Sequence, residues 1–364
     1  MNGGFRARAA LYLLACFFWL GAASSLPAAA RQAGSIQWPS AQALAFLGRS
    51  AGELSAGQVR TLQLHVRKNP QDSAARQTLT SWYWRQTLAG YHPHLERLRQ
   101  IQIFWLIANR PQSAILSVPP GQILETEDPV AYASAKKLWE AAARAHPNDV
   151  LILAAAASSL GRVDTALADR WLARAERLEP RQVVWNDARA ALWKKAALRR
   201  PDKARLALRE LQSAQDVDSS AFSRFNRLQA LAMDAYLSRQ TSLAENYARA
   251  MLRQAAASWR KSWDYANAVN RGHEVLGLCA LRRGDKARAG RELLLAGRCG
   301  SSPQLASFGP NMLLAQALLK AGNRGPVMDY LNECRGFWHS AVTGRWLAQI
   351  RAGRVPEFGS NLVY

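Results

Sequence analysis

Small and large apolar residues follow one another at helical spacing along much of the chain, and prolines end the runs. Two runs share the order small, large, small and proline at offsets of 4, 3 and 5, namely Ala135, Trp139, Ala142, Pro147 and Ala168, Leu172, Ala175, Pro180. Positions three and four apart lie on one face of an α-helix. Small residues let a second helix approach closely, and proline cannot continue the hydrogen-bond ladder. The pattern therefore predicts closely packed helices with defined ends.

A complementary pattern ends in glycine rather than proline. It occurs twice, as Leu276, Gly277, Ala280, Gly284 and as Leu314, Ala315, Leu318, Gly322. Each copy precedes another run with small and large apolar residues, namely Ala289, Leu293, Ala296 and Val327, Leu331, Cys334. Weaker copies of these second runs are Ala204, Leu208, Leu211 and Leu243, Tyr247, Ala250. We therefore expect pairs of antiparallel helices joined by short turns.

The expected turns recur at a nearly constant interval. They fall near Gly161, Arg200, Arg239, Gly284 and Gly322, with separations of 39, 39, 45 and 38 residues. A fixed period of this length is the signature of a helical repeat. With these motifs, the segment from about 130 to 340 resembles the tetratricopeptide (TPR) repeat superfamily, although its period exceeds the usual 34. The resemblance implies an all-α fold, a right-handed α-solenoid of antiparallel helix pairs.

The remainder of the chain divides into shorter segments. Helices are expected at 56–67, 72–88 and 94–108, as divergent N-terminal helices bounded by proline-containing stop signals. Residues 31–55 are expected to be an N-terminal tail. Residues 111–129 contain four prolines and one glycine and are expected to form a loop before the repeats. A C-terminal helix and a terminal tail are expected in 341–364.

The first thirty residues have the features of a secretory signal peptide. Arg6 and Arg8 precede an apolar run from residue 9 to 20, and small residues follow as far as Ala30. This order predicts export, with cleavage before Arg31. An uncleaved membrane anchor and a lipoprotein signal at Cys16 are the alternatives. Export would place the protein in the periplasm or at the cell envelope.

Charge narrows the range of possible partners. The formal net charge is +22, and removal of Arg6 and Arg8 with the signal would leave about +20. The basic residues are spread along the whole chain and export separates them from most nucleic acid, so no nucleic-acid partner is expected. An anionic envelope polymer, a lipid surface or an acidic protein stays possible, as does a basic surface that is simply solvated.

The cysteines and a search for catalytic motifs give little evidence for a metal site or an enzymatic activity. If the signal is removed, Cys279, Cys299 and Cys334 remain, and one pair of them could form a disulfide while the third stays free. The sequence has no Gly-x-Ser-x-Gly, no His-Glu-x-x-His and no phosphate-binding glycine loop. We therefore expect no metal, no cofactor and no enzymatic activity, and a helical enzyme is the least favoured alternative.

Two similar segments near the C-terminus are candidates for a binding site. Phe308-Gly309-Pro310-Asn311 and Phe358-Gly359-Ser360-Asn361 each place an aromatic residue before a glycine and end in asparagine. Together with Cys334-Arg335-Gly336-Phe337-Trp338, they resemble segments of uncharacterised bacterial secreted TPR-type proteins. In one interpretation Phe308, Asn311, Phe358 and Asn361 are structural. In the other they lie at one end of a concave face and hold a ligand.

A second candidate lies on one face of an expected first helix. Asn267, Asn270 and Glu274 are spaced by 3 and 4 residues, and Arg271 lies beside them. In tetratricopeptide solenoids first helices line the concave groove, where asparagine and arginine can hold a peptide. A polar, solvated face is the alternative. The sequence thus favours a non-enzymatic protein-protein interaction scaffold that binds a protein or extended peptide, with electrostatic binding of an anionic polymer or membrane as the alternative.

Overall fold

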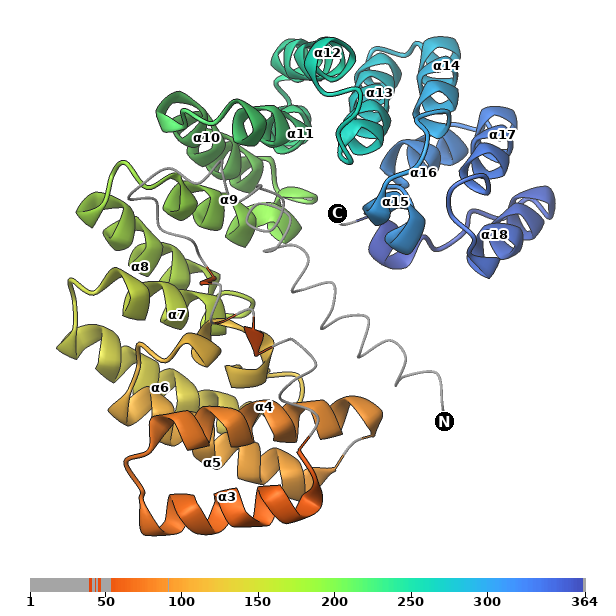
Figure 1. Ribbon diagram of the computed structural model, residues 1–364. Coiled ribbons are helices and arrows are strands. Elements are labelled where there is room, and N and C mark those ends of the chain that lie inside the picture. The colour runs from red at the N-terminus through yellow and green to blue at the C-terminus, as the bar shows by residue number, and fades with distance from the viewer. Residues whose placement is uncertain (1–38, 41–42, 44, 47–53, 91, 363–364) are drawn as a thin grey trace. The chain divides into compact units, whose positions relative to one another are not determined.

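The computed structural model describes residues 39–40, 43, 45–46, 54–90 and 92–362. In these ranges it consists of α-helices and short 3-10 helices, with no strand, which confirms the all-α class (Figure 1). The expected signal peptide and most of the expected tail lie outside the described residues. No helix in the described ranges is long and apolar enough to cross a membrane. The chain divides into two compact units, residues 1–192 and 193–364.

The first unit is built from helices that pack on their neighbours in sequence. The three expected N-terminal helices are present as α3 (Ala56–Lys68), α4 (Ser73–Ala89) and α5 (Pro93–Asn109). They are followed by α6 (Pro129–Ala145), α7 (Val150–Leu160), α8 (Thr165–Leu178) and the start of α9 (Val183–Ala197). Capping explains several of the boundaries, since Ser55, Asp72, Asp128 and Asp149 each accept a backbone N–H in the first turn of the helix that follows.

The proline-rich segment between α5 and α6 is not a solvated connection. It forms two 3-10 turns, η3 (Ala114–Ser117) and η4 (Pro119–Gly121), and its apolar side chains belong to the core of the first unit. Gly121 lies against the backbone of Ile115 and Leu116, where an added Cβ would clash with main-chain atoms. The segment therefore needs glycine for space.

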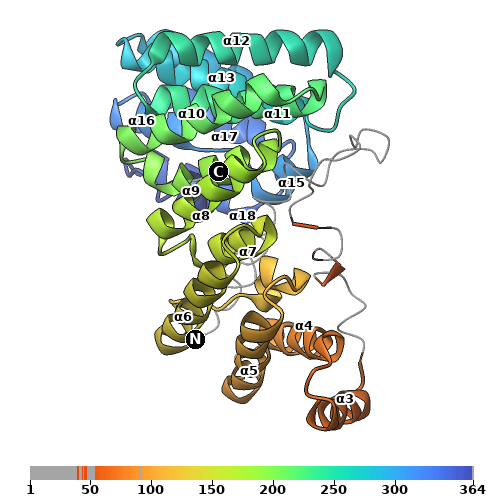
Figure 2. The same cartoon turned by 90° about the vertical axis from the view of Figure 1, so that its left-hand side faces the viewer.

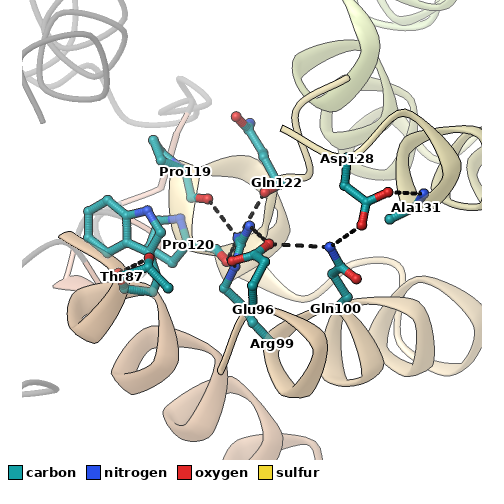
Figure 3. A network of polar contacts seen from close by, with 10 residues as sticks. Thr87, Glu96, Arg99, Gln100, Pro119, Pro120, Gln122, Asp128 and Ala131 are labelled. Carbon is teal, nitrogen blue, oxygen red and sulfur yellow. Dashed lines mark hydrogen bonds and ion pairs between the residues drawn. The ribbon is translucent and has the colours of Figure 1, made fainter. Parts of the chain in front are cut away.

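A buried arginine fixes this segment on α5 (Figure 3). Arg99 is 1% exposed and donates to the carbonyl oxygens of Pro120 at 2.8 Å and Gln122 at 2.9 Å. It also pairs with Glu96 at 2.6 Å. Because a guanidinium has five donors in a rigid fork, one side chain satisfies several acceptors at once. Arg99 thereby stabilises a buried segment whose own backbone hydrogen bonds are short-range turn bonds.

The second unit continues with the end of α9 and has two sets of helices. One set is α11 (Ala221–Leu237), α13 (Tyr265–Arg282) and α16 (Leu313–Lys320); the other is α10 (Pro201–Val217), α12 (Thr241–Ser258), α14 (Lys286–Gly297) and α17 (Gly325–Cys334). Within the first set α13 packs on both α11 and α16, and α12 packs on both α11 and α13. Figure 2 shows α10, α11 and α12 side by side with nearly aligned axes. The short α15 (Pro303–Phe308), α18 (Ala341–Arg351) and η5 (Gly359–Leu362) complete the unit.

Turns join the helices at all five expected places, between α7 and α8, α9 and α10, α11 and α12, α13 and α14, and α16 and α17. The last three, and the turn after α18, have one residue at positive φ: Arg239 (68°), Gly284 (87°), Gly322 (81°) and Gly353 (81°). In each, the next residue donates its N–H to the carbonyl five residues earlier, as in Gln240 to Ala235 at 2.9 Å and Asp285 to Ala280 at 3.0 Å. This is the Schellman helix end, which favours glycine at the left-handed position.

Most of the expected packing faces are confirmed, and one is wrong by a residue. The faces of α6, α8, α10, α14 and α17 are buried as expected. In α12 the buried face is Ala244, Ala248 and Met251 rather than Leu243, Tyr247 and Ala250. Two of the three buried positions of α12 are thus alanines, and the larger Leu243 and Tyr247 lie half-buried beside them. Size alone therefore suggested the wrong register.

Candidate functional site

The two Phe-Gly-x-Asn segments meet in the structure. Asn361 is buried, and its side-chain amide donates to the carbonyl oxygens of Phe308 and Pro310, both at 3.0 Å. The Met312 N–H donates to the Asn361 carbonyl at 2.8 Å. The end of the chain therefore closes on the connection between α15 and α16.

The other residues of these segments also have structural contacts. Phe358 is 2% exposed and meets the Trp346 ring edge-on, with centroids 4.9 Å apart. Asn311 accepts the N–H of Leu313, the first residue of α16, at 2.8 Å. Gly309 has φ 75° and lies where an added Cβ would be 2.5 Å from the Trp338 ring. Phe308 is the half-buried member of the set. These contacts favour the structural interpretation of both segments.

The polar face of α13 is attached to the same region. Asn267 donates to Gln304 at 3.1 Å and accepts from the Ser302 hydroxyl at 2.6 Å, which links α13 to the start of α15. Asn270 is buried and donates to the Ala296 carbonyl at 3.0 Å. The two asparagines therefore hold protein groups, and the acceptor of this face that stays unpaired in the described structure is Oε1 of Glu274.

Arg271 and Glu274 form an ion pair at 2.6 Å. Glu274 is 2% exposed, and its second carboxylate oxygen, Oε1, has no hydrogen-bond partner among the described residues. Burial raises the pKa of Glu274, and the Arg271 guanidinium opposes that rise. A buried acceptor without a donor is uncommon in proteins and calls for an explanation.

A second buried carboxylate on α11 lies in the electrostatic field of the same groups. Asp234 is 8% exposed, and in the described part of the chain its carboxylate accepts no hydrogen bond. Burial raises its pKa from 3.8 to about 7, while the charges of Lys194 and Arg271 act in the opposite direction. Desolvation of the Lys194 ammonium lowers its pKa, and the positive charge of Arg271 lowers it further. The Lys194 side chain as a whole is nevertheless exposed.

We call Lys194, Asp234, Arg271 and Glu274 the charged cluster. It brings together α9, α11 and α13, and the sequence pattern predicted only the two residues on α13, Arg271 and Glu274. Asp234 lies between Met233 and Ala235, on a helix whose neighbouring positions Leu231 and Ala232 are buried. A lone acidic residue in such an apolar run was the feature of the sequence that could have indicated Asp234 as a site residue. Lys194 carried none, because its place near Arg271 depends on how the helices pack.

The cluster has the chemistry of a binding site for polar groups. It offers carboxylate acceptors beside two cationic side chains, in surroundings where such interactions are stronger than in water. Across the described residues, no group of three or more histidine, cysteine, aspartate or glutamate side chains could hold a metal ion. His273, next to Glu274 in sequence, faces elsewhere and contacts Glu292 at 2.8 Å.

The cysteines among the described residues, Cys279, Cys299 and Cys334, are free and buried. Burial raises the pKa of Cys279 to about 11 and of Cys299 to about 12, and it raises that of Cys334 as well. The thiolate is the reactive form of cysteine. These residues therefore serve as core side chains in this structure, in place of the disulfide that the sequence left open.

No protein-family model matches the chain, and no curated protein is similar to it at a significant level.

Proposed function

We propose that the protein is a non-enzymatic binding scaffold with a TPR-like α-solenoid architecture. The support is the packing of the second unit, where each helix of the α11, α13, α16 set contacts the next and the intervening helices pack against the same set. Schellman ends at three successive inter-helix turns add a repeated local structure. In such arrays each repeat contacts its neighbours, and a preformed surface results.

The binding site in this proposal is the charged cluster, and the partner is a protein that presents an extended segment. One observation carries the proposal: the buried Oε1 of Glu274 has no hydrogen-bond donor in the described structure. Because this oxygen is shielded from solvent, the side chains over it would have to move aside before a donor from the partner, either a backbone N–H or a lysine or arginine side chain, satisfies it. It would also compensate the buried carboxylate of Asp234. Leaving a buried acceptor unpaired costs about 1–3 kcal/mol, which the partner would recover.

Rigidity is the second part of the mechanism. The polar groups of α13 around the cluster are already held, since Asn267 and Asn270 bond to protein groups and Arg271 is paired with Glu274. A site that is ordered before binding loses less conformational entropy when the partner arrives. On binding, α11 and α13 would therefore keep their positions, and the rearrangement would be limited to the side chains that cover Oε1 of Glu274.

We also propose that the protein is exported to the bacterial envelope, because residues 1–30 have the order of a signal peptide. Fractionation with N-terminal sequencing of the recovered chain tests this. A mature chain that begins at Arg31 in the periplasmic fraction is expected, and an intact chain in the cytoplasm would rule the proposal out.

The binding proposal is tested by capture from envelope extracts after cross-linking. The double variant Asp234→Asn, Glu274→Gln removes both buried charges and keeps the side-chain shapes. A matched control, Asp216→Asn with Asp329→Asn, removes two charges from exposed positions on α10 and α17. We expect one enriched protein with the wild type and the control, and a loss of at least about tenfold with the cluster variant. Equal capture by all three, or no enriched protein with the wild type, would refute the proposal.

A further inference from the structure

A row of basic residues lies along one edge of the second unit. Four helices, α11, α13, α16 and α18, end at Schellman turns. These turns and their flanks carry eight exposed cationic residues, namely Arg239, Arg282, Arg283, Lys286, Lys320, Arg324, Arg351 and Arg354. We call these eight residues the basic edge.

Hydrogen bonds between successive turns place these turns side by side. Arg282 donates to the Tyr236 carbonyl at 2.7 Å, which joins the α13 turn to the α11 turn. Lys286 donates to the Ala321 carbonyl at 2.9 Å, which joins the α13 turn to the α16 turn. Arg324 donates to the Gly353 carbonyl at 3.0 Å, which joins the α16 turn to the end of α18. The edge is therefore a continuous row of four turns.

These contacts hold the cations without neutralising them. A carbonyl accepts one or two N–H groups, while the positive charge and the remaining donors of arginine and lysine stay available. Arg282 is further held by stacking on the Tyr236 ring, 3.7 Å from its centroid. The side chains are thus arranged in advance for an anion, which lowers the entropy cost of binding.

Opposing charge on this edge is small. Within residues 238–241, 282–286, 320–324 and 351–354 the one acidic residue is Asp285, which caps α14 through the Arg288 N–H at 2.8 Å. Glu245, outside these turns, pairs with Arg283. Each helix C-terminus contributes about half a negative charge, so the four ends contribute about −2. With the eight cations, the two carboxylates and the four helix ends counted, the net charge of the basic edge is roughly +4. The edge therefore has more positive charge than the helix ends neutralise.

We propose that the basic edge binds a linear polyanion with closely spaced phosphate or carboxylate groups. A single row of turns matches a chain of charges better than it matches a plane. Arginine supplies six of the eight cations, and its planar fork fits phosphate and carboxylate oxygens. Val355 is the one exposed large apolar residue next to this edge in the described part of the chain. Insertion into a lipid surface is therefore disfavoured.

The test compares two variants that each remove four positive charges. The edge variant is Arg239→Asn, Lys320→Gln, Arg351→Gln and Arg354→Gln; asparagine tolerates the left-handed conformation at 239. The control is Arg205→Gln, Arg209→Gln, Arg253→Gln and Arg291→Gln, at exposed positions on α10, α12 and α14. Circular dichroism melting establishes that both variants are folded. Binding is measured by fluorescence anisotropy with labelled inorganic polyphosphate and labelled polyglutamate over a range of NaCl concentrations.

We expect the wild type to bind at low salt with log K falling linearly against log [NaCl]. The edge variant should lose about tenfold or more in affinity and show a shallower slope, while the control should lose less than about threefold. A preference for polyphosphate or for polyglutamate identifies the charged group, and either supports the proposal. Equal loss in both variants, no binding of either polymer, or tighter binding to phosphatidylglycerol vesicles would overturn it.

Discussion

At the scale of single residues, the buried carboxylate of Asp234 makes the fold sensitive to pH. Its pKa rises from 3.8 to about 7 on folding because burial disfavours the charged form. Between these values the folded protein holds a proton that the unfolded chain has lost. The free energy of unfolding therefore falls as pH rises from about 4 to about 7, at up to about 1.4 kcal/mol per pH unit. A site with such a cost is typical of a functional position.

Replacing Asp234 by asparagine should remove this dependence. We expect Asp234→Asn to raise the free energy of unfolding at pH 8 by up to about 4 kcal/mol relative to its effect at pH 4, because the neutral amide has no buried charge. Urea unfolding at the two pH values measures the difference. The control is Asp216→Asn, at an exposed position, where the same difference should be within about 0.5 kcal/mol. A pH-independent effect at Asp234 would mean that the carboxylate is solvated.

At the scale of elements, Arg99 determines whether the segment between α5 and α6 stays in the core. Arg99→Met keeps an apolar stem of similar length but leaves the Pro120 and Gln122 carbonyls and the Glu96 carboxylate without their donor. We expect a loss of about 3–5 kcal/mol in the free energy of unfolding, as for a broken buried ion pair. Arg97→Met, at an exposed position on the same helix, should change it by less than about 0.5 kcal/mol. A small loss at Arg99 would show that the segment is held by its apolar contacts.

The elements also show how far the sequence could be interpreted. Helix limits in 56–109 and all five inter-helix turns were predictable, because caps, prolines and glycines act locally. The segment 111–129 was expected to be a loop because prolines and glycines favour loops. The same residues also favour buried 3-10 turns, and the sequence does not report burial. The α12 register was wrong by one residue because the helix buries Ala244, Ala248 and Met251, while the larger Leu243 and Tyr247 beside them are half-buried.

The candidate site was predictable only in part, for a related reason. Spacing along one helix placed Asn267, Asn270, Arg271 and Glu274 together, but their neighbours come from other helices. The two asparagines form hydrogen bonds with Ser302, Gln304 and the Ala296 carbonyl. The charged residues near Arg271, Lys194 and Asp234, come from α9 and α11. Such contacts depend on packing between helices far apart in sequence. A single sequence has no signal for them.

At the scale of the whole molecule, the contacts within each unit join elements that are close in sequence. Effects of a substitution should therefore stay near its site, as in repeat proteins with nearest-neighbour coupling. Asn361→Ala removes the donor from the Phe308 and Pro310 carbonyls, at a cost of about 1–3 kcal/mol. We expect faster amide hydrogen exchange in α15 to α18 and unchanged exchange in α3 to α7.

Arg99→Met gives the reciprocal test in the first unit. Exchange should accelerate in α4 to α7 and stay unchanged in α13 to α18, because the elements that pack most extensively on α5, namely α4, α6 and η3, belong to the first unit. Amide hydrogen exchange followed by mass spectrometry on both variants distinguishes a local effect from an effect on the whole chain. If either variant accelerates exchange throughout the described chain, the protein unfolds as one cooperative body. The nearest-neighbour description, and with it this support for a repeat array, would then be wrong, because coupling between adjacent helices alone does not transmit a local loss across the whole chain.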